Sequence, residues 1–201
     1  GQVITNQLRK GFLDRKLSDA IKRGILQIAR QRPETEDGEG LRCVQQAAYV
    51  LGEFTDPQTG ATLANIANDY ADEPFMIGAV LSSVNASNIE DVATSLLNRP
   101  VKNAATNAVL GEILAMAVAW EKWSIIDQTA AHLSRDRNVK RRIAATVALT
   151  DAIRKTKRPF EKVLKRETLG SLYRIACVAR SQARHARIDP ADRVSALRLF
   201  G

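Results

Sequence analysis

Apolar residues recur three and four positions apart along most of the chain, which places them on one face of an α-helix. The stretch from Leu41 to Val84 begins with this spacing at Leu41, Val44, Ala48 and Leu51. The same spacing returns in the later segments. No segment alternates apolar and polar residues between hairpin turns, as a half-buried strand would. The pattern predicts an all-α fold without a β-sheet.

Prolines and capping residues mark the breaks between the expected helices. Asp56-Pro57 and Asp189-Pro190 pair a capping aspartate with a proline at the first helical position, where its missing N–H costs nothing. The run Ser87-Asn88-Ile89-Glu90 has the spacing of a capping box. We expect helices at residues 3–13, 17–31, 40–54, 58–71, 74–84, 88–98, 103–119, 122–134, 138–155, 159–165, 168–187 and 190–200.

An internal repeat of about 31 residues links successive pairs of these helices. Ala48, Val50 and Ile66 have counterparts at Ala79, Leu81 and either Leu96 or Leu97. A helix pair cannot bury its apolar face alone, so pairs of this kind stack on their neighbours. We therefore expect one domain over residues 1–201, a right-handed superhelix of antiparallel helix pairs. It would have irregular helices and an acidic loop at 1–40, regular repeats at 41–155 and basic helices at 156–201.

Several motifs resemble known helical proteins. The run from Leu41-Arg42 through Ala47-Ala48 and Leu51-Gly52 to Asp56-Pro57 resembles HEAT-type repeats. The motifs AYVLGEFTDPQTGATLANIA, DEPFMIGAVLSSV and DRVSALRLFG resemble a family of large bacterial membrane-bound dehydrogenases, over about 160 residues from Leu41 onward. In that family a propeller is followed by a helical-repeat segment and a c-type haem domain. The resemblance implies a helical middle segment of an exported or periplasmic redox protein.

The resemblance does not carry catalytic or cofactor residues to this chain. A covalent haem needs Cys-x-x-Cys-His, and neither Cys43 nor Cys177 begins that motif. The chain begins GQVITNQLRK, without methionine or an apolar signal core, so we expect a fragment of a longer protein. The longest apolar run, at 104–119, has 16 residues, short of the ~20 needed to cross a membrane. We therefore predict no cofactor and no transmembrane segment.

Charge is distributed unevenly along the chain. Residues 135–198 contain 18 Lys and Arg against 6 Asp and Glu, whereas residues 1–134 have a net charge of −4. Such a basic half can attract nucleic acid or another anionic partner. The alternative, which is common for charged runs, is a set of solvated helix faces. The candidate anionic-partner surface comprises Arg137, Lys140, Arg141, Arg142, Arg154, Lys155, Lys157 and Arg158.

Two tryptophans and a carboxylate form a second candidate site. Trp120 and Trp123 are three residues apart, and Asp127 follows one turn later. Together they could line a groove that holds a base, as in helical-repeat DNA glycosylases. The competing interpretation is that the tryptophans fill the junction between helix pairs, because they bury a large apolar area.

The remaining candidates for chemistry are isolated. His132 and His185 have no second ligand at metal-site spacing. Cys43 and Cys177 lie among apolar neighbours and are expected to be buried. Glu112 lies in the most apolar helix, where burial would tune its acidity unless it reaches solvent or an arginine.

These observations favour a function in binding over catalysis. We expect a non-catalytic scaffold that contacts neighbouring domains of the same polypeptide or a protein partner. Nucleic-acid binding by the basic half is the alternative, and a glycosylase-like enzyme is third.

Overall fold

The computed structural model describes residues 15–30, 39–99 and 104–184, together with Val194 and Leu197. Within these residues there are ten helices and no strands, which confirms the predicted all-α fold. Their bounds lie within a few residues of those expected from the sequence. The helices predicted at 3–13 and 190–200 fall outside the described residues, apart from Val194 and Leu197.

Contacts divide the chain into two compact units, Gly1–Arg99 and Pro100–Gly201, whereas the sequence suggested subdivisions after residues 40 and 155. The described helices of unit 1 are α2 (Arg15–Arg30), α3 (Glu39–Leu51), α4 (Pro57–Asp69), α5 (Pro74–Ser83) and α6 (Ile89–Leu97). Those of unit 2 are α7 (Ala104–Ala119), α8 (Trp123–Arg135), α9 (Val139–Lys155), α10 (Phe160–Val163) and α11 (Arg166–Arg184).

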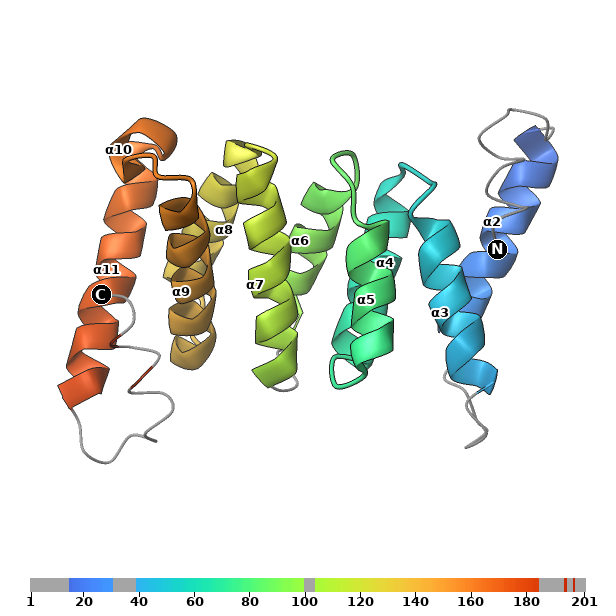
Figure 1. Ribbon diagram of the computed structural model, residues 1–201, viewed down its shortest axis with the longest axis horizontal. Helices are drawn as coiled ribbons and strands as arrows, with labels where there is room; N and C mark the ends of the chain where they lie inside the picture. Colours follow the sequence, from blue (N-terminus) through green and yellow to red (C-terminus); the bar gives the residue numbers. More distant parts are fainter. Residues whose placement is uncertain (1–14, 31–38, 100–103, 185–193, 195–196, 198–201) are drawn as a thin grey trace. The chain divides into compact units, whose positions relative to one another are not determined.

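Unit 1 is built from helix pairs in two layers. Helix α3 packs on α5 and α4 packs on α6, while α2 contacts both α3 and α4 (Figure 1). The core between the layers contains Leu51, Leu63, Ile66 and Ile89, all of which are fully buried. The apolar stripes expected from the sequence thus become the surfaces on which successive pairs stack.

Two glycines allow the helices of each layer to approach closely. A Cβ atom added at Gly52 would lie 2.8 Å from the Cα atom of Ser83, and one added at Gly60 would overlap the Cβ atom of Asp91. Both contacts join residues 31 positions apart, which agrees with the internal repeat found in the sequence. Equivalent positions of α3 and α5, and of α4 and α6, therefore lie side by side.

The starts of α4 and α6 show one correct expectation and one error. Asp56 caps α4, with Pro57 as the first helical residue, as predicted. The predicted capping box is wrong, because α6 begins at Ile89 with Asn88 as its N-cap residue. The Ser87 hydroxyl donates instead to Asn85 Oδ1.

Unit 2 repeats the two-layer arrangement. Helix α7 packs on α9, α8 packs on α11, and the short α10 lies between α9 and α11 in the chain (Figure 1). A Cβ atom added at Gly111 would lie 2.9 Å from the Cβ atom of Ala148. An ion pair joins Arg158 Nη2 to Glu121 Oε1 at 2.6 Å, just beyond the ends of α9 and α7. Both contacts span 37 residues, so α7 and α9 run parallel.

Candidate interaction surfaces

A groove lies on unit 2 between α7 and α9, with a volume of about 390 Å³. Most of the residues that line the groove are alanine or glycine, so few long side chains project into it. The alanines and the glycine, from α7 and α9, are Ala108, Gly111, Ala115, Ala144, Ala148 and Ala152. The three- and four-residue spacing of these positions is visible in the sequence, but sequence reasoning treated both helices only as packing elements and missed the groove.

Charged side chains line both walls of this groove. Glu112 extends from α7, and Asp151 and Lys155 extend from α9. Glu112 is exposed, so the alternative in which this carboxylate reaches solvent is confirmed. Arg154 Nη1 lies 3.6 Å from Asp151 Oδ1. The groove can therefore present negative charge to a ligand from two sides and a lysine at one end.

The residues predicted to form one basic surface lie at two ends of α9. Arg137 and Lys140 are at its N-terminal end and are exposed. The other exposed basic residues of the predicted surface lie at its C-terminal end, about 25 Å away along this 17-residue helix. We call this second group, which is exposed, the basic edge: Arg154, Lys155, Lys157 and Arg158.

Arg141 does not belong to a basic surface, which corrects the sequence-based assignment. Only 5% of the residue is exposed, and its Nε atom lies 3.5 Å from Asp136 Oδ2. Burial lowers the pKa of Arg141, while the nearby Asp136 acts in the opposite direction. The adjacent Arg142 is partly buried. Arg141 is therefore buried at the start of α9, beside Asp136, and is not exposed to a partner.

The three residues of the predicted aromatic groove differ in exposure and in hydrogen-bond partners. Trp120 lies in the α7–α8 connection and is 38% exposed, whereas Trp123 is the partly buried first residue of α8. The Asp127 carboxylate accepts a hydrogen bond from the Thr168 hydroxyl at 2.5 Å and pairs with Lys165 Nζ at 3.2 Å. Both of its oxygens therefore help to hold the start of α11 against α8, and none of the three residues lines the α7–α9 groove.

The described residues contain no cluster of three or more His, Cys, Asp or Glu side chains that could bind a metal ion. His132 is partly buried on α8, while His185 lies outside the described residues. The expectation that the cysteines are buried is wrong, because Cys43 and Cys177 are both free and exposed. Each is exposed on its helix, although Val44 follows Cys43 and Cys177 lies between Ala176 and Val178.

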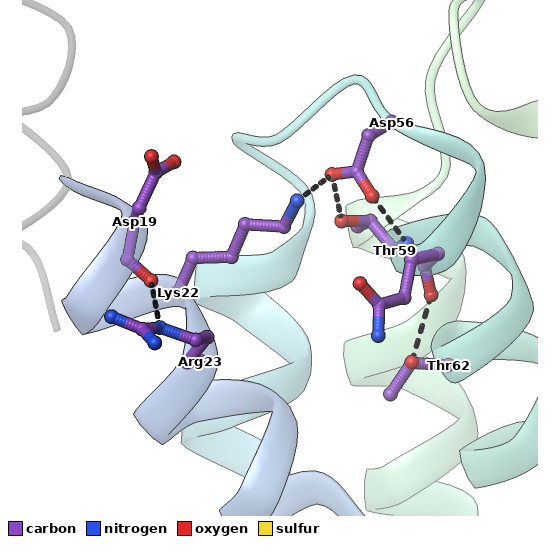
Figure 2. A network of polar contacts seen from close by, with 7 residues as sticks. Asp19, Lys22, Arg23, Asp56, Thr59 and Thr62 are labelled. Carbon is purple, nitrogen blue, oxygen red and sulfur yellow. Dashed lines mark hydrogen bonds and ion pairs between the residues drawn. The ribbon is translucent and has the colours of Figure 1, made fainter. Parts of the chain in front are cut away.

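Unit 1 contains a polar network at the start of α4 (Figure 2). Lys22 Nζ, on α2, lies 2.8 Å from Asp56 Oδ2. The same oxygen accepts a hydrogen bond from the Thr59 hydroxyl at 2.7 Å, and Oδ1 accepts one from the Thr59 backbone N–H at 3.2 Å. Asp56 therefore caps α4 and fastens it to α2, and its negative charge is favoured at a helix N-terminus.

The carboxylates near this network have opposite pKa shifts. Burial acts to raise the pKa of Asp56, but the hydrogen bonds from Lys22 and Thr59 outweigh it, so the pKa is lowered. Burial raises the pKa of Asp91, and the negative charges of Glu90 and Asp56 raise it further. Asp56 is thus stabilised in its charged form, whereas Asp91 is not.

We expect Asp56→Asn to reduce the stability of unit 1 by about 0.5–1 kcal/mol at neutral pH, because asparagine still caps but cannot pair with Lys22. A lowered folded-state pKa contributes stability that is fully present above about pH 4 and is lost as the pH falls through the lowered value. The difference between the parent chain and Asp56→Asn should therefore shrink in acid. Denaturant unfolding at a series of pH values measures it. Lys22→Met should show the same pH dependence, and a constant difference would contradict the assignment.

No family model, curated protein or solved structure matches the chain. Among the described helices, none combines the length and apolar character that crossing a membrane requires.

Proposed function

We propose that the chain is a non-catalytic protein-interaction module and that the α7–α9 groove is its docking site. The groove carries the proposal because it is open and has a carboxylate on each wall, at Glu112 and Asp151. A helix of a partner that lies in such a groove buries apolar surface and gains specificity from the charged residues beside it. Small wall residues permit a close approach of the partner backbone.

The architecture supports the same proposal. In each unit, parallel helices of one layer lie side by side, so that a row of helix faces is available to a partner. We propose that these pairs are of the HEAT type. The motif resemblance suggests that the partner is a neighbouring domain of an exported redox protein or a protein that assembles with it.

Site-specific cross-linking tests the docking site. A benzophenone amino acid placed at Ala108, which is exposed and lines the groove, should form an adduct with one defined protein in an extract of the source cells. The matched control is the same group at Ala131, an exposed alanine on α8. Mass spectrometry identifies the adduct. Equal adducts at both positions, or none at Ala108, would count against the proposal.

A second candidate function is nucleic-acid binding through the basic C-terminal half. The exposed basic edge favours it. However, Arg154 and Arg158 are each paired with a carboxylate, at Asp151 and Glu121, and this reduces the charge available for phosphates. Binding of this kind would weaken steeply with salt, because it releases counterions.

A further inference from the structure

The α7–α9 groove opens at the basic edge. Lys155 belongs to both, since it lines the groove and is the last residue of α9. Lys157 follows two residues later. Neither lysine forms an ion pair with an acidic residue in the part of the chain that the structure describes, in contrast to Arg154 and Arg158. This end of the groove therefore offers Lys155 to a ligand, and the exposed Lys157 lies beside it in the chain, just beyond the end of α9.

Lys157 has a backbone conformation that favours glycine. Its φ angle is 58°, in the left-handed region, at the residue after the C-cap Thr156. Helices commonly end with glycine at this position, because a Cβ atom is strained there. A lysine in its place retains a charge at a cost in stability, which is the pattern expected where a side chain serves a function.

The direction of the groove follows from its two helices. Because α7 and α9 run parallel, the partial negative charges of both C-termini lie at the basic edge. A helix bound antiparallel to them would bring its positive N-terminus to this end. Acidic residues are favoured in the first turn of a helix, and here they would meet Lys155 and Lys157.

We propose that the groove binds one helix of a protein partner, antiparallel to α9, with acidic residues in its first turn against Lys155 and Lys157. A basic residue about one turn later lies between Glu112 and Asp151, because Asp151 precedes Lys155 by four residues, about 6 Å along α9. This inference rests on the proposed function and adds the chemistry and direction of the partner.

The charges of the groove favour a protein helix over a nucleic acid. A phosphate backbone presents negative charge along its whole length and would meet the carboxylates of Glu112 and Asp151 after the first lysines. A helix can present acidic residues at one end and a basic residue further along. The order of charges along the groove, with Lys155 at its end and the carboxylates of Asp151 and Glu112 further in, is complementary to such an alternating ligand.

Two synthetic helical peptides provide the test. Both have about 14 residues, or four turns, with the same composition. One carries glutamates in its first turn and an arginine one turn later, and the other carries the same sequence in reverse order. Fluorescence anisotropy of labelled peptides with the full chain should show about fivefold to tenfold tighter binding of the first peptide, as two exposed ion pairs allow. Equal binding of both peptides, or no binding of either, overturns the proposal.

Variants of the full chain locate the contact. Lys155→Gln and Lys157→Gln should each weaken binding of the first peptide, whereas Arg137→Gln, at the other end of α9, should leave it unchanged. Lys157→Gly should bind more weakly and yet unfold at a higher temperature, because it removes both the charge and the backbone strain. Tighter binding of a thymidine oligonucleotide than of the first peptide would favour the nucleic-acid function and overturn the proposal.

The outcomes separate this inference from the proposed function. If the benzophenone at Ala108 captures a defined partner but Lys155→Gln and Lys157→Gln do not alter peptide binding, the docking site stands and the direction of the helix is wrong. If the cross-link at Ala108 is itself absent, the proposed function fails.

Discussion

Gly60→Ala is expected to destabilise unit 1 by about 2 kcal/mol, although alanine is the better helix former. The added methyl group would overlap the Cβ atom of Asp91 and lie 3.2 Å from the backbone nitrogen of Val92 and 3.3 Å from the carbonyl oxygen of Asn88. Two of these neighbours are backbone atoms of the α6 start, so they cannot rotate away. Relief requires α4 and α6 to move apart, which loosens the packing of Leu63 and Ile89.

The same substitution at Gly78 is the matched control. Gly78 lies in α5 of the same unit and is exposed, and a Cβ atom there would have no other atom within 4 Å. Gly78→Ala should therefore stabilise the chain by about 0.5–1 kcal/mol through helix propensity alone. Denaturant unfolding monitored by circular dichroism compares the two variants. Stabilisation by both would show that the close approach of α4 to α6 is absent in solution.

The contrast between these glycines shows what the sequence can predict. Proline and aspartate placement locates the start of α4, because Asp56 and Pro57 act on their own turn of helix. The 31-residue repeat indicates which helices are equivalent. It does not indicate how closely they approach, because that depends on the side chains of two helices at once. Gly60 and Gly78 are equally plausible helix interruptions in the sequence, yet only Gly60 faces another backbone.

The same reason explains the outcome for the candidate sites. Arg141 and Arg142 are consecutive in a basic run, but they lie about 100° apart around α9, so one turns inward towards Asp136 and the other remains partly exposed. Charge counts do not resolve this difference. The α7–α9 groove depends on the register between Gly111 and Ala148, which lie in different helices. The spacing of residues within one helix predicts which residues share a face. A groove lies between two helices, so predicting it also requires knowing which helix packs beside that face and in which register.

The second large effect concerns Asn88, a fully buried polar residue in the α5–α6 connection. Its Oδ1 atom accepts a hydrogen bond from the backbone N–H of Asn85 at 2.8 Å, and its Nδ2 atom donates to the carbonyl oxygen of Ser83 at 3.0 Å. Asn85 in turn donates from Nδ2 to the carbonyl oxygen of Gly52 at 2.9 Å. The buried Asn88 amide thus holds the turn between α5 and α6. Through Asn85, the same turn is bound to the end of α3.

Asn88→Ala is expected to cost about 2–4 kcal/mol, since it removes both hydrogen bonds and leaves the Asn85 N–H and the Ser83 carbonyl without their partner. Asn88→Asp should not restore the loss, because aspartate keeps the acceptor but places a charge beside the Ser83 carbonyl oxygen in a buried site. Ser87→Ala, in the adjacent and exposed position, should change the free energy of unfolding by no more than about 0.5 kcal/mol. Denaturant unfolding of the three variants measures these differences. The reverse order, with Ser87→Ala more harmful than Asn88→Ala, is what a capping box at Ser87 and Glu90 would produce and would contradict the hydrogen bonds of this turn.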